Sequence, residues 1–163
     1  MKKIPCVMMR GGTSRGAFLL AEHLPEDQTQ RDKILMAIMG SGNDLEIDGI
    51  GGGNPLTSKV AIISRSSDPR ADVDYLFAQV IVHEQRVDTT PNCGNMLSGV
   101  GAFAIENGLI AATSPVPAYV SATSIRVRSS KLMCKRQMVL SSTRVAPELT
   151  AYRVLPHRLR SLS

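Results

Sequence analysis

The residue with the clearest chemical potential in this sequence is Cys93, which stands just before an almost uncharged run, residues 96–105. Pro91 biases the residue before it away from helical angles, and Asn92 is a residue type that often caps a helix N-terminus. The positive end of a helix dipole attracts anions and favours a thiolate over a thiol. The sequence therefore predicts a reactive cysteine where a helix begins. The alternative interpretation is that Cys93 is only a small buried residue.

Lys59 is the candidate base, because it follows a triple-glycine turn, residues 51–53, and precedes an apolar, β-branched segment, residues 60–63. A phosphate-binding P-loop requires Gly-Lys-Ser/Thr followed by a helix. Here Ser58 precedes the lysine and strand-forming residues follow it, so the P-loop interpretation is rejected. Burial disfavours a charged ammonium group, so a lysine in a closed apolar site would accept a proton near neutral pH. A solvated surface lysine is the ordinary alternative.

A second glycine-rich turn, residues 9–16, combines three glycines with Thr13 and Ser14. Such a turn is able to present several N–H groups to an anion. Its spacing is not that of a dinucleotide-binding fingerprint, and a plain hairpin is the alternative. His83 ends a predicted strand, where a structural role is the expectation. The sequence has no Cys-x-x-Cys or paired His–Cys spacing, so no metal site is predicted.

The elements that must position these residues are predicted from the apolar pattern. Residues 96–105 have no polar face and are expected to form a central buried helix, in which Gly99 allows a close neighbour at a cost in helix propensity. This helix is expected to end near Asn107-Gly108, a pair typical of a left-handed stop. An earlier helix is expected to begin near residues 25–27 and to end at Gly40 or Gly42. Because strands come in consecutive runs, the fold class is α+β with a mixed or antiparallel sheet. The predicted strands are residues 4–9, 17–21, 60–63 and 75–83.

Composition restricts the class of protein. The chain has 163 residues, 43% of them hydrophobic, which suffices for one domain with a core and argues against disorder throughout. The sequence contains no apolar run of membrane-spanning length and no apolar signal-peptide segment. Three widely spaced cysteines, an odd number, favour a reducing compartment over a disulfide scaffold, so a cytoplasmic location is expected.

Three segments, in this order, resemble the PrpF family of 2-methylaconitate isomerases, whose relatives include 4-oxalomesaconate tautomerases. They are residues 9–16 (MRGGTSRG), 51–61 (GGGNPLTSKVA) and 91–95 (PNCGN), and the resemblance runs from residue 1 to about 115. It implies the diaminopimelate epimerase-like fold, in which two similar domains each curl a sheet around a central helix and the active site lies between them. The implied reaction is a 1,3-allylic proton shift in a small unsaturated di- or tricarboxylate, without a metal or organic cofactor.

By this resemblance, Lys59 and Cys93 match the two catalytic positions of the family. A neutral Lys59 would remove the allylic proton, and Cys93 would assist or return a proton from another side. Backbone N–H groups and polar side chains of the matching motifs would hold the substrate carboxylates and the developing negative charge. The residues expected to bind substrate are Gly11, Gly12, Thr13, Ser14, Arg15, Asn54, Ser58, Asn92, Gly94 and Asn95. A homodimer is one assembly that the protein is expected to be able to form. No membrane partner is expected.

The sequence changes character near residue 116. Residues 1–116 hold all 13 glycines and have 10 Lys and Arg against 13 Asp and Glu, a net charge of −3; residues 117–163 have 9 Lys and Arg against one acid, a net charge of +8. We expect residues 1–116 to be a PrpF-like N-terminal domain of an incomplete two-domain protein. Residues 117–163 are expected to be a basic tail, frameshifted or disordered, in which only residues 118–127 suit a strand.

Several alternatives stay open from sequence alone. A genuine basic extension would bind nucleic acid or acidic partners, but its basic residues show no helical stripe or aromatic stacking pattern, so nucleic acid is not the expected partner. A site that lacks one wall would leave Lys59 wet and a poor base, so this chain is expected to be inactive or poorly soluble. A module that only binds a small carboxylate, and a cysteine-nucleophile enzyme using His83, are the other functions considered.

Overall fold

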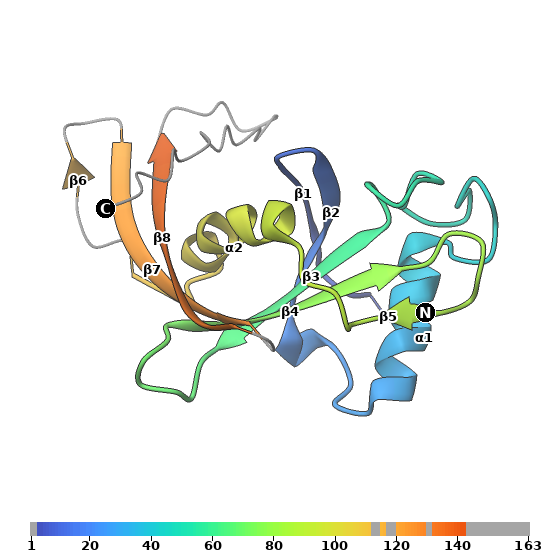
Figure 1. Ribbon diagram of the computed structural model, residues 1–163, viewed down its shortest axis with the longest axis horizontal. Helices are drawn as coiled ribbons and strands as arrows, with labels where there is room; N and C mark the ends of the chain where they lie inside the picture. The colour runs from blue at the N-terminus through green and yellow to red at the C-terminus, as the bar shows by residue number, and fades with distance from the viewer. Residues whose placement is uncertain (1–2, 112–114, 117–119, 130–131, 143–163) are drawn as a thin grey trace, which may run out of the picture.

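The computed structural model describes residues 3–111, 115–116, 120–129 and 132–142, and within them it places two α-helices and a single mixed eight-stranded sheet (Figure 1). This confirms the predicted α+β class. In chain order the elements are β1 (Val7–Gly11), β2 (Ser14–Leu20), the 3-10 helix η1 (Ala21–His23), α1 (Gln28–Met39), β3 (Lys59–Arg65), β4 (Val73–Val80), β5 (Val87–Asp88), α2 (Gly94–Glu106), β6 (Pro115–Val116), β7 (Val120–Ser129) and β8 (Leu132–Ser142). None of the helices in these ranges is both long and apolar enough to span a bilayer.

The order of the strands determines where their ends meet. The sheet runs β1-β2-β3-β4-β7-β6, with β5 paired to β4 and β8 paired to β7. β2 and β3 are parallel, whereas β3 and β4 are antiparallel. Helix α1 lies in the connection from β2 to β3, as a parallel crossover requires. The N-terminal ends of β2 and β3 and the C-terminal end of β4 therefore lie at one edge of the sheet.

Both faces of the central strands are buried. On β3, Ala61 and Ile63 belong to the core cluster that includes α2, whereas Val60 and Ile62 belong to the cluster that includes α1. Successive side chains of a strand point to opposite faces, so burial on both faces explains why residues 60–63 read as one continuous apolar run.

Helix α2 is the central buried helix that the sequence predicted. It contacts β1, β2, β3, β4 and β8, and Figure 1 shows it lying across the sheet between the β1–β2 hairpin and the β7–β8 pair. A Cβ atom added at Gly99 would lie 2.8 Å from a ring carbon of Phe18. The Phe18 ring also contacts Phe103, with 5.8 Å between the ring centroids. The glycine therefore permits a close contact between this helix and β2.

The helix ends are confirmed except at one position. Asp27 caps α1 by accepting a hydrogen bond from the Gln30 amide at 2.8 Å, and Gly40 ends that helix with φ +81°. Gly108, with φ +68°, ends α2 as the left-handed stop that the sequence predicted. The assignment of Asn92 as the cap of α2 was wrong, because the N-cap is Cys93. The Cys93 backbone is extended and its carbonyl already accepts the first helical hydrogen bond, from the Leu97 amide at 2.9 Å.

Strand boundaries differ from the predicted ones where the chain has other constraints. The first strand begins at Val7 rather than residue 4, since Pro5 lacks the N–H that a ladder requires. β4 ends at Val80, because the Ile81 amide donates to the Arg86 carbonyl in a turn that leads into β5. After residue 116 the sheet continues with two strands, β7 and β8, where the sequence allowed one strand in a tail. β7 is rich in β-branched residues and serine, and neither strand contains glycine.

Candidate active site

The candidate site lies at the sheet edge where β2 and β3 begin and α2 begins above them. In the register of the sheet, Gly16 of β2 is opposite Lys59 of β3, and Lys59 is opposite Gln79 of β4. Phe18, two residues after Gly16, packs against α2. Because side chains alternate along a strand, Ser14, Lys59 and Gln79 all project from the face of the sheet that α2 covers.

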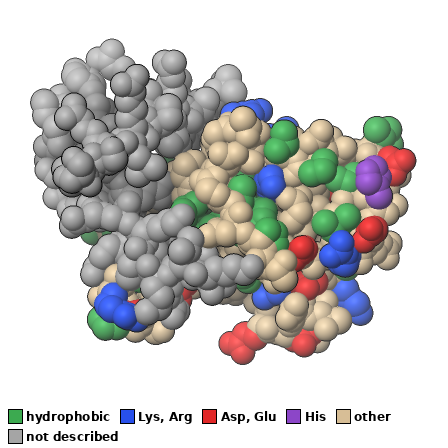
Figure 2. Space-filling model, in the orientation of Figure 1, with side chains coloured by type: hydrophobic (Ala, Val, Ile, Leu, Met, Phe, Trp, Pro, Cys, Tyr) green, Lys and Arg blue, Asp and Glu red, His purple; other side chains and the backbone are tan. Residues whose placement is uncertain are grey.

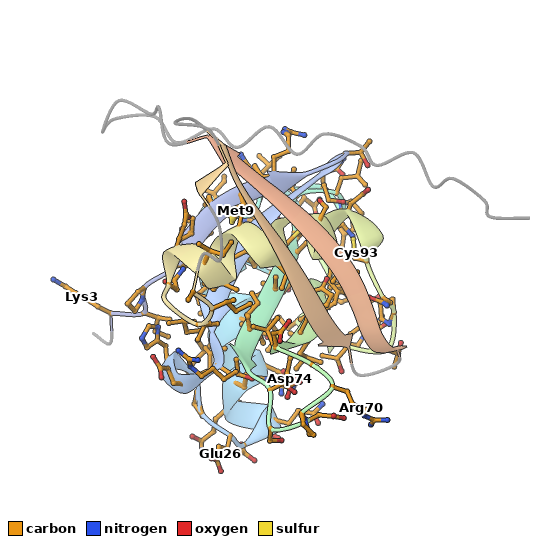
Figure 3. All side chains as sticks on the ribbon, turned by 90° about the vertical axis from the view of Figure 1, so that its left-hand side faces the viewer. Lys3, Met9, Glu26, Arg70, Asp74 and Cys93 are labelled. Atoms are coloured by element: carbon orange, nitrogen blue, oxygen red, sulfur yellow. The ribbon has the colours of Figure 1, made fainter. Side chains whose placement is uncertain are left out.

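Cys93 is the N-cap residue of α2, and its thiol does not cap the helix. It is partly exposed, its side chain makes no capping hydrogen bond, and its Sγ lies 3.9 Å from the Oγ of the buried Ser14. The Tyr75 hydroxyl donates to the Cys93 carbonyl oxygen at 3.3 Å. Burial, with a smaller contribution from negative charge at Cys93, raises the pKa of Tyr75 far above its ordinary value, so this hydroxyl remains a donor. Figure 3 labels Cys93 near one end of α2.

Lys59 is surrounded by neutral groups. Its Nζ donates to the Oε1 of Gln79 at 2.6 Å and lies 5.0 Å from the centre of the Phe77 ring, which is a cation–π distance. The lysine is half-buried at the start of β3. An amide oxygen and a ring face both stabilise an ammonium group without binding it as strongly as a carboxylate would.

The two predicted catalytic residues share one face and one edge of the sheet without touching. Ser14, which approaches Cys93, is two residues from Gly16, which is opposite Lys59. Two residues of a strand span about 6–7 Å. Gly16, which lies next to Lys59 in the register, contributes no side chain to the space between Ser14 and Lys59.

The β1–β2 hairpin contacts the beginning of α2 directly. The Nδ2 of Asn95 donates to the Oγ1 of Thr13 at 2.8 Å and lies 3.4 Å from the Oγ of Ser14. A Cβ atom added at Gly11 would overlap the Asn95 carbonyl. At Gly12, where φ is +53°, an added Cβ atom would lie 2.5 Å from the Asn95 Oδ1. The turn is thus a plain hairpin in which glycine allows contact with the helix, and Thr13, Ser14 and Asn95 are brought together beside Cys93.

Asn92 and Gly94 flank the cysteine on its open side. Asn92 is exposed, and a Cβ atom added at Gly94 would meet no atom within 4 Å. The first N–H groups of a helix have no partner within the helix. The backbone at Gly94 and Asn95 therefore offers N–H groups without helical partners next to the thiol, and the space beside Gly94 is open.

Arg15, Asn54 and Ser58 form a framework around the triple-glycine turn. Arg15 Nη2 donates to the Gly51 carbonyl at 2.6 Å, and its Nε is buried without a hydrogen-bond partner. Asn54 accepts from the amide of Leu56 with its side chain and from two following amides with its carbonyl. Ser58 is fully buried and its side chain points to the opposite face from Lys59. The structure does not bring the Ser58 side chain to the face where Lys59 lies, because its hydroxyl donates to Glu46.

Glu46 is a buried carboxylate that sequence reasoning missed. It is only 2% exposed, its φ is +49°, and it accepts hydrogen bonds from the amides of Gly52 and Gly53, at 2.8 and 3.0 Å, and from the Ser58 hydroxyl. A Cβ atom at Gly51 would overlap this carboxylate. One signal was present in the sequence: an acid shortly before three glycines is able to satisfy the N–H groups that a glycine turn exposes.

Substitution of Glu46 by glutamine is expected to lower the free energy of unfolding by about 1–3 kcal/mol, because one carboxamide NH₂ group must then face the N–H and O–H donors that the carboxylate now accepts. Chemical denaturation measures the loss, and amide hydrogen exchange at residues 51–53 shows whether the turn opens. The matched control is Glu84→Gln, which removes the same charge at an exposed ion pair with Arg86 and is expected to change stability little. Equal stability of the two variants would contradict the assigned contacts.

Metal-ligand geometry is not found in the described part of the chain, where no three or more His, Cys, Asp or Glu side chains converge. His83, the other residue considered from sequence, is exposed and its Nδ1 lies 2.8 Å from the Oδ1 of Asp44. These two side chains connect two loops. Figure 2 shows acidic and basic side chains interspersed over the described part of one face of the molecule.

Comparisons with known proteins show which family the chain resembles. The family model described as "PrpF protein" matches residues 1–141, which extends past residue 115, where the motif resemblance was expected to end. A protein from Escherichia coli K12 named "Putative isomerase YbhH" is 92% identical over 129 residues, covering 79% of this chain and 35% of that protein. A 4-oxalomesaconate tautomerase from Pseudomonas putida is 60% identical over 111 residues, covering 68% of this chain and 31% of that protein.

A solved structure has the same fold in its matching part. The crystal structure of a methylitaconate-delta-isomerase superposes with a TM-score of 0.72 at 47% sequence identity, covering 78% of this chain and 31% of that one. The chain thus spans about a third of the length of the curated relatives that it matches.

Proposed function

Because the chain belongs to the PrpF protein family, we propose that it carries the catalytic side of an isomerase site for small unsaturated di- or tricarboxylates. The reaction is a 1,3-allylic proton shift that moves a C=C bond. The observation that carries the proposal is the placement of Lys59 and Cys93 on one face and one edge of the sheet, with Ser14 and the glycine hairpin beside them.

Lys59 acts as the base in this proposal. Its neutral amine removes a proton from the allylic carbon, and the electron pair is delocalised over the double bond and the neighbouring carboxylate as a dienolate-like anion. Its partners, the Gln79 amide oxygen and the Phe77 ring, are both uncharged. General base catalysis of this kind contributes about 10²–10⁴-fold to a rate.

Cys93 is the group that returns a proton at the far carbon of the allylic system. Its thiol stands at the beginning of α2, and Ser14 Oγ lies within 3.9 Å of it. The helix dipole stabilises the thiolate that remains after proton transfer. One proton leaves and one arrives, and the double bond moves by one position, so no redox partner is needed.

Substrate carboxylates are bound by backbone N–H groups that have no hydrogen-bond partner within the helix. The N–H groups at Gly94 and Asn95 lie beside Cys93, and the Asn95 side chain is held by Thr13. Anions are stabilised at such a helix N-terminus. Arg15 contributes long-range positive charge, while one of its nitrogens supports the Gly51 carbonyl.

The part of the relatives that this chain does not match supplies the facing wall of the site in our proposal. In this proposal the matched part adopts the diaminopimelate epimerase-like arrangement, a sheet curled around α2, and a second similar domain closes over Lys59 and Cys93. Closure matters because excluding water strengthens every electrostatic contact with the substrate. The residues that match the family model, 1–141, together with this second domain then form the complete enzyme.

Solvent-proton exchange tests the function directly. A chimera that continues residues 1–116 with the remaining C-terminal part of the Escherichia coli relative is incubated in D₂O with methylitaconate or oxalomesaconate. We expect deuterium to enter the allylic position together with the isomerised product, as read by proton NMR and mass. Thermal stabilisation by these acids without deuterium entry would instead show a module that only binds carboxylates.

A further inference from the structure

The side-chain amide of Gln79 is held by an unusual number of backbone carbonyls. Its Nε2 lies 2.7 Å from the Ser58 oxygen, 3.1 Å from the Pro55 oxygen and 3.3 Å from the Val80 oxygen. Its Oε1 accepts from Lys59 Nζ at 2.6 Å. Gln79 and Lys59 are directly opposite each other on β4 and β3, a position in which side chains of the same face interact.

This set of partners determines which way the amide points. Carbonyl oxygens only accept hydrogen bonds and an amine or ammonium group donates them. A flipped amide would place its oxygen against three carbonyl oxygens and its NH₂ group against the lysine. The contacts therefore hold Oε1 toward Lys59 in a single orientation, and they connect the lysine to residues 55–58 at the end of the glycine-rich loop.

From these contacts we infer that Gln79 is the positioning residue for Lys59: it orients the lysine amine through an uncharged acceptor to which both the ammonium and the neutral amine can donate an N–H. An amine that donates one N–H to Oε1 directs its lone pair away from Gln79. A carboxylate at the same position would form an ion pair and hold the lysine in its charged form. This inference rests on the proposed function, in which Lys59 is the base.

The first test uses the reactivity of Lys59 in the complete 163-residue chain, which requires no turnover. The wild type, Gln79→Glu and Gln85→Glu are labelled with acetic anhydride between pH 6 and 11, and modification of Lys59 is quantified by peptide mass spectrometry with the exposed Lys33 as internal reference. In Gln79→Glu we expect the midpoint of Lys59 labelling to move up by about one pH unit. Gln85→Glu adds the same charge at an exposed position and is expected to leave the midpoint in place. An unchanged midpoint in folded Gln79→Glu would overturn the inference.

A second measurement needs no variant, so it decides the question if Gln79→Glu does not fold. In the proton–nitrogen NMR spectrum of the wild-type chain, the Gln79 side-chain NH₂ is expected to exchange with solvent at least about tenfold more slowly than that of the exposed Gln85, because both hydrogens are bonded to carbonyls. Exchange as fast as that of Gln85 would show that the amide is not fixed and would remove the basis of the inference.

Turnover separates the positioning role from the proposed function itself. In the chimera, Gln79→Glu is expected to lower kcat at neutral pH at least about tenfold, to move the acidic limb of the kcat–pH profile upward, and to leave KM within about twofold. If the chimera shows no proton exchange at all, the proposed function fails while the labelling and NMR results still decide the role of Gln79. If turnover depends on Lys59 but Gln79→Glu keeps the wild-type pH profile, only the positioning role is wrong.

Discussion

Replacing Lys59 with alanine in the chimera is expected to lower kcat by about 10²–10⁴-fold, because the variant loses the group that removes the allylic proton. Replacing Cys93 with serine should have an effect of the same order, since a serine hydroxyl is a far weaker acid than a thiol at the beginning of a helix. Deuterium entry into the substrate measures both effects. It also separates them: a variant that still exchanges protons but forms no product has lost the step that returns the proton.

Matched controls make these losses interpretable. Lys33→Ala removes an exposed lysine and Cys6→Ser removes an exposed cysteine, and both are expected to keep wild-type turnover. Thermal unfolding of all four variants shows whether the fold survives, which we expect because Lys59 and Cys93 are only partly buried. Turnover near the wild-type value in Lys59→Ala or in Cys93→Ser would sink the assignment of that residue.

The second large effect is a difference in turnover between the chimera and the 163-residue chain. We expect the chimera to turn over substrate and the 163-residue chain to be at least about 10²-fold slower or poorly soluble. In the described residues, Lys59 and Cys93 are both partly open to solvent, and Leu45, Ile47 and Leu56 expose apolar surface on loops. Water at an uncovered site weakens the electrostatic stabilisation of a dienolate-like anion, and exposed apolar patches promote association.

The comparison has its own control. The chimera carrying Lys59→Ala must lose the activity that the chimera gains, otherwise that activity belongs to the C-terminal part alone. Size-exclusion chromatography of both proteins reports association, and it also tests the expected homodimer. Equal turnover by the 163-residue chain and the chimera would show that residues 1–116 need no facing wall, and would contradict the proposed role of the second domain.

Local signals were sufficient to predict much of this protein. The uncharged run before Asn107-Gly108 predicted a buried helix with a left-handed stop, and Gly108 has φ +68° there. Asp27 and Gly40 predicted the two ends of α1. Such features are determined within one helical turn, by side-chain caps and by the freedom of glycine to adopt positive φ. For the same reason, Cys93 was correctly predicted to stand where the helix begins.

Contacts between residues distant in the chain could not be predicted in this way. The assignment of Asn92 as a cap followed its residue type, whereas the structure uses Cys93 because its carbonyl accepts from Leu97 and its thiol turns toward Ser14. By residue type, Glu46 is expected at the surface. Only in the folded chain do the amides of Gly52 and Gly53 donate to its carboxylate, with Gly51 packed beside them. Single-sequence patterns report burial and turns, but they do not report which strands pair.

The sequence by itself determined the α+β class, the buried helix, and the identities of the two candidate catalytic residues, because periodicity, turn chemistry and motif resemblance are all properties of short segments. Only the tertiary structure decided that Lys59 and Cys93 share one face and one edge of the sheet, and that Gln79 holds the lysine. Those relations depend on the parallel pairing of β2 with β3 and the antiparallel pairing of β3 with β4. Strand register is set by packing across the whole core, and a shift of one residue would turn Lys59 to the opposite face.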